Sequence, residues 1–223
     1  MIRTDTGAWL EALTGRAPVD TGRFVQALTH GSANANNYER LEFLGDRVLG
    51  LIIAEWLFAR FPDEPEGKLS RRFNVLVSGE TCADIARAVG VPAHLILGKQ
   101  ARDDGAVDSD NVLGDVMEAM IGALFLDAGM DAAKALVRRL WADRVDNQAA
   151  APKHPKSALQ EWAAAHKRKP PEYVMTGKSG PHHALRFAVT VSIKGAGEAS
   201  AEGGSKQEAE TAAATALLDK LTG

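Results

Sequence analysis

The hydrophobic and polar positions of the chain follow a helical period over roughly its first two thirds. Apolar residues there recur every three or four positions, which is the spacing of one helix face. Gly- or Pro-containing breaks separate several of these segments. The pattern predicts an all-α domain over residues 1–147. The predicted helices lie near residues 5–14, 20–30, 37–60, 67–78, 80–89, 110–127 and 130–145.

The pattern changes after "VDNQAAAPKHPK" (145–156), which has two prolines and no apolar period, so we expect a linker over 148–154. "PKSALQEWAAAHK" then predicts a short helix, and "PEYVMTGKSG" and "HALRFAVTVSIKG" alternate as strands do. "GEASAEG" is a weaker third strand. An Ala-rich helix opens at Ser205, with Glu208 completing a capping box. Residues 155–223 are therefore expected to form a small α+β unit of order α-β-β-β-α.

Charge is distributed unevenly between these two parts. The formal net charge of −3 does not by itself suggest a nucleic-acid partner. Residues 153–223, however, contain 10 Lys/Arg and 7 Asp/Glu, whereas residues 1–152 contain 16 and 22. An acidic body with a mildly basic appendage is typical of a two-domain protein.

Several classes of protein are excluded by composition. The apolar run Val48–Phe58 is too short to span a bilayer and contains Glu55. The first residues lack the continuous apolar stretch of a secretory signal. Cys82 is the single cysteine, so neither an internal disulfide nor a Cys-based zinc site is expected. These observations predict a cytoplasmic protein without a membrane partner.

Three acids share one face of the predicted helix over 37–60. At 100° per residue, Glu39, Glu42 and Asp46 fall within an arc of about 60°. A solvated acidic face is one interpretation. Gly45 and Gly50 weaken it, because each costs up to about 1 kcal/mol against Ala in a helix interior unless close backbone approach requires it.

The segment 111–127 is apolar nearly all the way round, as expected for a buried helix, yet it carries Asp115 and Glu118. Buried carboxylates without partners are costly and tend to become protonated. Either a basic side chain pairs with them, or the two acidic helices face each other and share a divalent cation. Oxygen ligands of this kind favour Mg²⁺ or Mn²⁺ over zinc. The arginines that could pair with them are Arg40, Arg47, Arg71 and Arg72.

A further acidic group, Asp63, Glu64 and Glu66, lies in a Pro/Gly-rich turn that opens a helix. Acids at a helix start routinely complement the dipole, so their spacing alone indicates a structural role. The clustered acids as a whole favour metal-dependent hydrolysis of a phosphodiester, in which the metal activates water and neutralises developing charge.

Three motifs resemble the ribonuclease III family: "NYERLEFLGDRVLG" (37–50), "EGKLSRR" and "DVMEAMIGALFLD", in that order. The C-terminal unit is similar to a double-stranded-RNA-binding domain in "PKSALQEWAAAHKRKPPEY", "SGPHHALRFAVTV" and "GGSKQEAETAAATALL". The resemblance implies a homodimeric endonuclease that cuts both strands of duplex RNA, with two sites along a valley at the dimer interface. It implies products with 5′-phosphates, 3′-hydroxyls and short 3′ overhangs.

The resemblance also assigns roles to individual acids. Mg²⁺, with Mn²⁺ as a substitute and no organic cofactor, is expected on Glu42, Asp46, Asp115 and Glu118. Loss of Glu118 is expected to abolish cleavage while leaving RNA binding. Glu39 and Glu66 match further acids of the site, so the expected catalytic residues are Asp46, Glu118, Glu39 and Glu66. Processing of ribosomal precursors and processing or decay of messenger RNA are the implied tasks.

The second unit is expected to read the shape, phosphates and 2′-hydroxyls of duplex RNA. By resemblance, six residues carry this: Gln160 and Glu161 at one minor groove, Pro181 and His182 at the next, and Ser205 and Lys206 on phosphates at a helix start.

Gln207 and Glu210 depart from the Lys-rich pattern of many relatives after Lys206. Both lower the positive potential at the helix start. The sequence therefore predicts weaker and more salt-sensitive RNA binding by this unit than in a Lys-rich relative.

Dimerisation is expected through the apolar surface around Phe43, Leu44 and Val48, with Gly45 a candidate for close packing in the dimer or the catalytic valley. Two other readings stay open. The chain could be a non-catalytic RNA-binding scaffold, although all six site acids are present. A helical phosphohydrolase for small nucleotides would not explain the C-terminal unit.

Overall fold

The computed structural model of the chain describes residues 4–147, 153–179 and 185–222. The chain divides into two compact units, 1–152 and 153–223, and each is described by itself.

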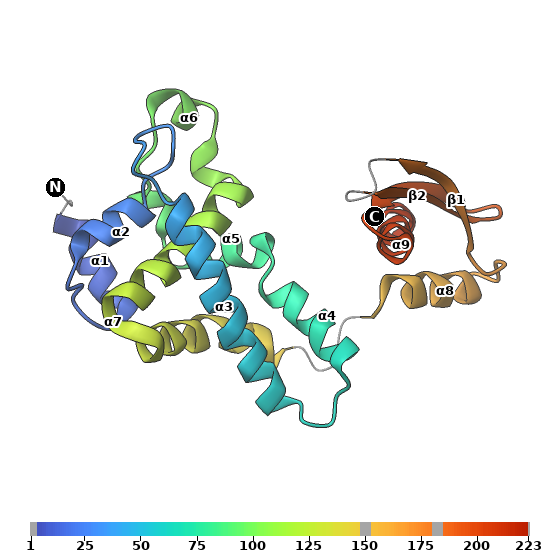
Figure 1. Ribbon diagram of the computed structural model, residues 1–223, viewed down its shortest axis with the longest axis horizontal. Helices are drawn as coiled ribbons and strands as arrows, with labels where there is room; N and C mark the ends of the chain where they lie inside the picture. Colours follow the sequence, from blue (N-terminus) through green and yellow to red (C-terminus); the bar gives the residue numbers. More distant parts are fainter. Residues whose placement is uncertain (1–3, 148–152, 180–184, 223) are drawn as a thin grey trace. The chain divides into compact units, whose positions relative to one another are not determined.

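The described part of the first unit is helical, as the sequence predicted (Figure 1). The short helix α6 and two 3₁₀ turns were not predicted, because three to five residues are too few to show a helical period. The elements are α1 (Thr4–Thr14), α2 (Thr21–Ala27), α3 (Glu39–Arg60), α4 (Glu66–Leu76), α5 (Gly79–Ala88), η1 (Val91–His94), α6 (Lys99–Asp103), η2 (Ala106–Asp108) and α7 (Asp110–Asp146).

The long element α7 bends at Gly129, whose backbone is non-helical (φ 81°, ψ −177°). Glycine adopts this positive φ without the steric cost that a side chain brings. The break predicted between residues 127 and 130 is therefore a kink between two helical halves.

The core of this unit forms where α3 and α5 pack against α7. Leu49 and Ile53 of α3 and Val116 and Ile121 of α7 are completely buried. Trp141, in the second half of α7, is also buried and donates its indole N–H to the carbonyl of Leu76 at 2.7 Å. The aromatic ring therefore fills the core while its polar atom is satisfied.

Helices α3 and α7 cross with their backbones in direct contact. A Cβ atom added at Gly45 would overlap the carbonyl group of Glu118, and one added at Gly122 would overlap the carbonyl oxygen of Leu41. The close approach predicted for Gly45 is confirmed, and its partner is α7 of the same chain. Gly50 is different, because a Cβ there would meet only the Phe73 ring at an ordinary 3.5 Å.

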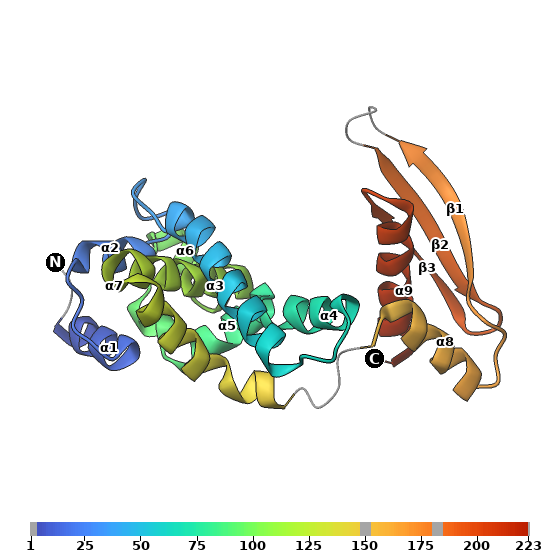
Figure 2. The same ribbon diagram turned by 60° about the horizontal axis from the view of Figure 1, so that its bottom comes forward.

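The second unit is a three-stranded antiparallel sheet with two helices, and all five predicted elements are confirmed. Figure 2 shows α9 lying along the sheet and α8 beside α9. The strand order is β1-β2-β3, so the central strand pairs on both sides. The elements are α8 (Pro155–Ala165), β1 (Glu172–Ser179), β2 (Arg186–Ile193), β3 (Gly197–Gly203) and α9 (Lys206–Thr222).

A small core holds this unit together, formed by Leu159 of α8, Val191 and Ile193 of β2, and Ala213 and Leu217 of α9, all buried. Small alanines on α9 let the helix lie close to the sheet.

The predicted capping box at the start of α9 forms with one difference, because Glu208 accepts the N–H of the residue before Ser205. Ser205 Oγ accepts the Glu208 N–H at 3.1 Å, and Glu208 Oε2 accepts the Gly204 N–H at 2.7 Å. In the described ranges, no helix combines the length and apolar character that crossing a membrane requires.

Candidate active site

The close crossing of α3 and α7 gathers three carboxylates at one place. Glu42 comes from the first turn of α3, and Asp115 and Glu118 come from the first half of α7. The charge of Asp115 raises the pKa of Glu42, and the charges of both raise the pKa of Glu118. Of the acids predicted to face each other across the two helices, Glu42, Asp115 and Glu118 are therefore near enough to repel one another.

Glu118 is the most perturbed of these acids, with only 9% of the residue exposed. Burial, then the charges of Glu42 and Asp115, raise its pKa to about 7. The Cys82 thiol of α5 points at Glu118 Oε1, with its sulfur 3.9 Å away. A carboxylate held in these surroundings is stabilised by a nearby cation.

Asp115 is held by Tyr38, the residue that precedes α3. The Tyr38 hydroxyl donates to Asp115 Oδ2 at 3.3 Å, and the tyrosine is itself buried. Burial, followed by the Asp115 charge, raises the pKa of Tyr38 well above its usual range, so the phenol keeps its proton and acts as a donor. Burial raises the pKa of Asp115, while the bond from Tyr38 and the charge of His30 oppose this.

The other predicted acids have different surroundings. Glu39 is exposed in the first turn of α3, and its charge adds to the raised pKa of Glu42. Asp46 forms an ion pair with the neighbouring Arg47. Glu66 is exposed at the start of α4, where its carboxylate accepts the Ser70 hydroxyl at 2.5 Å.

Pairing with arginine accounts for little of the buried negative charge. Arg47 lowers the pKa of Glu42 and Glu118, but burial and acid–acid repulsion outweigh it. Arg72 is buried elsewhere, with two 2.8 Å hydrogen bonds to Glu64 and its guanidinium 3.8 Å from the Phe61 ring. Glu64 therefore has the structural role that its position suggested.

The donor set fits a hard divalent cation, because Glu42, Asp115 and Glu118 offer oxygen atoms and Arg47 offsets the raised pKa values of Glu42 and Glu118 only in part. Within the described ranges, no three His, Cys, Asp or Glu side chains already converge at metal-binding distance. The acids are gathered but their side chains are not arranged as a finished coordination sphere.

Two residues of the site, Tyr38 and Cys82, were missed by sequence reasoning. Tyr38 is adjacent to Glu39 in the "NYERLEFLGD" stretch, so its position was a usable signal. Cys82 lies 36 positions from Glu118, and nothing in the local pattern connects the two.

The predicted RNA-binding residues of the second unit lie on α8 and at the start of α9, apart from Pro181 and His182, which fall outside the described residues. Gln160 and Glu161 are exposed on α8, and Glu161 forms an ion pair with Lys153. Lys206 is the first residue of α9 and Ser205 directly precedes it, at the predicted helix start. Lys206 Nζ is 3.8 Å from the Glu210 carboxylate.

Comparison with known proteins identifies the family. Residues 21–144 match the family model described as Ribonuclease-III-like. A ribonuclease 3 from Zymomonas mobilis is 64% identical over 96% of this chain and 87% of its own length. The chain belongs to the ribonuclease III family. It is therefore an endoribonuclease specific for double-stranded RNA, and membership implies a metal-dependent nuclease.

Further matches agree with this. Residues 155–221 match the double-stranded RNA binding motif. The ribonuclease 3 of Rhodobacter capsulatus is 46% identical over 99% of this chain and 97% of its own length. The crystal structure of the nuclease domain of ribonuclease III from Campylobacter jejuni covers 61% of this chain and 94% of its own, with 35% identity and a TM-score of 0.59.

The raised pKa of Glu118 predicts a pH-dependent stability in protein freed of divalent ions. Its folded pKa of about 7 exceeds the ordinary value of 4.5, so the folded state binds more protons between these values. Stability should therefore fall as pH rises from about 4.5 to 7, by at most about 3 kcal/mol from this group. Urea unfolding at pH 5 and pH 8 in chelator measures the difference.

Glu118→Gln should remove most of this pH dependence and be the more stable protein at pH 8. Glu11→Gln, at an exposed position of α1, provides the control and should behave like wild type. Equal pH profiles for all three proteins would contradict the assigned burial and repulsion.

Proposed function

We propose that this enzyme hydrolyses phosphodiesters in both strands of duplex RNA with Mg²⁺ held by Glu42, Asp46, Asp115 and Glu118. The main support is the group formed by half-buried Asp115 and buried Glu118 of α7 with Glu42 of α3, all three with raised pKa values. When bound, Mg²⁺ supplies an activated water and neutralises charge on the transferred phosphoryl group. Mn²⁺, with the same preference for oxygen ligands, is expected to substitute.

The protein's own groups prepare this site. Tyr38 holds Asp115 in one orientation through its hydroxyl. The buried thiol of Cys82 contacts Glu118 Oε1 and shields that oxygen from water. Asp46, which pairs with Arg47 in this structure, would be the fourth acid to hold the cation. Glu39 and Glu66 act as supporting acids at the rim, where Ser70 orients Glu66.

A homodimer is the proposed assembly of the nuclease unit. A related structure, the nuclease domain of ribonuclease III from Campylobacter jejuni, is described as having a region involved in dimer formation. In this chain Phe43, Leu51 and Phe58 of α3 are exposed by 60% or more, and exposed apolar surface favours association. Val48, expected to take part, is 5% exposed and belongs to the core, so Phe43 is the better anchor.

Phe43→Gln is expected to raise the dimer dissociation constant by about 30-fold or more, as for an aromatic anchor worth about 2 kcal/mol. Light scattering between 1 and about 50 µM would show the shift to monomer. Val19→Gln is the matched control, because Val19 is 76% exposed but lies before α2. A wild type that is monomeric throughout would refute the dimer.

The products proposed are 5′-phosphate and 3′-hydroxyl ends with short 3′ overhangs. We also propose a cytoplasmic enzyme that processes ribosomal precursors and processes or degrades messenger RNA. The double-stranded RNA binding motif supports the substrate class, since it adds a second surface for the duplex.

A direct test uses end-labelled duplex RNA and its separated single strands, each incubated with Mg²⁺, Mn²⁺ or chelator. Cleavage of the duplex alone, dependent on either metal, with ends that a ligase joins and a phosphatase alters, is expected. Binding of duplex without cleavage in any metal would favour the scaffold alternative.

A further inference from the structure

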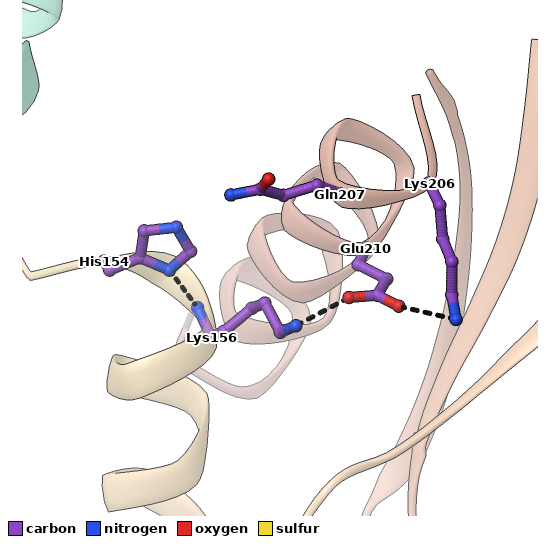
Figure 3. Close-up of a pocket in the computed structure, with 5 residues that line it drawn as sticks. All are labelled: His154, Lys156, Lys206, Gln207 and Glu210. Carbon is purple, nitrogen blue, oxygen red and sulfur yellow. Dashed lines mark hydrogen bonds and ion pairs between the residues drawn. The ribbon is translucent and has the colours of Figure 1, made fainter. Parts of the chain in front are cut away.

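The starts of α8 and α9 enclose a hollow of about 520 Å³ lined by His154, Lys156, Lys206, Gln207 and Glu210 (Figure 3). Its centre is the Glu210 carboxylate, which lies between two ammonium groups. Lys156 Nζ donates to Glu210 Oε2 at 2.6 Å, and Lys206 Nζ is 3.8 Å from Oε1. Only 16% of the Glu210 side chain is exposed.

The two lysines are held very differently. Lys156 makes a short charge-assisted hydrogen bond, and its ammonium group also lies 4.8 Å from the centre of the Tyr173 ring. Lys206 is 65% exposed, and its 3.8 Å separation is an ion pair beyond hydrogen-bond distance. Lys206 can therefore turn away while Glu210 keeps its stronger partner.

From this asymmetry we propose that Glu210 acts as an internal substitute for an RNA phosphate, holding Lys206 when RNA is absent and so limiting the affinity of this unit for duplex RNA. The proposal rests on the proposed RNA-binding role of Lys206. To reach a phosphate, Lys206 gives up the carboxylate, and the incoming phosphate then meets the negative charge of Glu210 nearby. Both effects oppose binding.

The proposal also leads to an expected salt dependence, whose slope differs from the one predicted from the sequence. Cations condensed on the RNA are released when Lys or Arg side chains neutralise its phosphates. Because the nearby Glu210 carboxylate offsets the charge of Lys206, the contact of Lys206 with a phosphate neutralises less RNA charge and releases fewer cations. The wild type should have a shallower slope than a variant without the Glu210 charge. Its binding is nevertheless lost at lower salt, because its affinity is lower to begin with.

The experiment measures duplex RNA binding by the full chain in chelator, where cleavage is prevented, by fluorescence anisotropy from 50 to 300 mM salt. Glu210→Gln keeps the shape of the side chain and a carbonyl acceptor for Lys156. We expect it to bind about three- to tenfold more tightly near 0.1 M salt, with a log–log slope steeper by about one. Glu198→Gln is the control and should bind RNA as tightly as wild type. Glu198 lies near the other end of α9, where its backbone carbonyl accepts a hydrogen bond from Lys220.

A second background separates a local effect from a general change of charge. In the Lys206→Met background, Glu210→Gln should raise the affinity for duplex RNA by less than half as much, on a logarithmic scale, as it does in the wild-type background. An undiminished gain would show that Glu210 does not act through Lys206 and would overturn the proposal, as would equal affinity of Glu210→Gln and wild type. Glu210→Ala replaces Glu210→Gln should the latter melt at a clearly lower temperature than wild type.

Failure of the inference and failure of the proposed function look different. A wild-type chain that does not bind duplex RNA would refute the role of the second unit. A wild type that binds normally, with variants that bind no better, would refute only the part assigned to Glu210.

Discussion

Glu118→Gln is expected to lower the rate of duplex RNA cleavage by about 100-fold or more, while leaving RNA affinity in chelator within about twofold of wild type. Even loss of an outer partner of a metal ligand typically costs 10- to 100-fold, and Glu118 is proposed to bind the metal itself. Glutamine has nearly the same shape, so the contact with Cys82 and the packing of α7 survive. Single-turnover cleavage and anisotropy measure the two quantities.

Glu11→Gln removes an exposed acid from the same unit and should cut at the wild-type rate. Raising the Mg²⁺ or Mn²⁺ concentration should recover part of the lost activity if the variant binds metal weakly. Cleavage by Glu118→Gln at close to the wild-type rate would show that the site is wrongly assigned.

Gly45→Ala is expected to destabilise the nuclease unit by about 3 kcal/mol or more, in spite of the better helix propensity of alanine. The added methyl group would occupy the position of the Glu118 carbonyl, so α3 and α7 would have to separate. Overpacking of a rigid core typically costs about 1–3 kcal/mol. Here the new methyl group would meet the carbonyl oxygen and carbon of Glu118, which belong to the backbone and cannot rotate away as a side chain could. Urea or thermal unfolding of the full chain measures the loss.

Gly50→Ala is the matched control on the same helix. Its new methyl group would meet the Phe73 ring at 3.5 Å, so we expect a gain of about 0.5–1 kcal/mol from helix propensity. Similar stabilities of the two variants would contradict the backbone-to-backbone crossing.

Sequence reasoning succeeded where residues disagreed with their surroundings. Asp115 and Glu118 stand in an apolar helix, and Gly45 interrupts another, so each needed an explanation beyond local structure. A common cause, two helices crossing closely with their acids together, explains all three. The helical period and the strand alternation predicted the two folds for a similar reason, because each is a repeated signal over many residues.

What could not be predicted depends on single contacts between distant residues. Arg72 was one of four possible partners for the buried acids, and only the packing of α4 shows that it pairs with Glu64 and covers Phe61. Tyr38 becomes a donor to Asp115 across 77 positions of sequence. Gly50, which resembled Gly45 in sequence, has no close neighbour that requires it. Periodicity places a residue on a face but does not say which atom lies opposite.

The position of Cys82 gives the enzyme a built-in chemical reporter. It is the single thiol of the chain, it is completely buried, and burial together with the Glu118 charge raises its pKa far above the usual range. A thiol reagent needs an accessible thiolate, so labelling in the native protein proceeds through openings that part α5 from α7. The labelling rate therefore reports how often the structure around Glu118 opens, without any introduced probe.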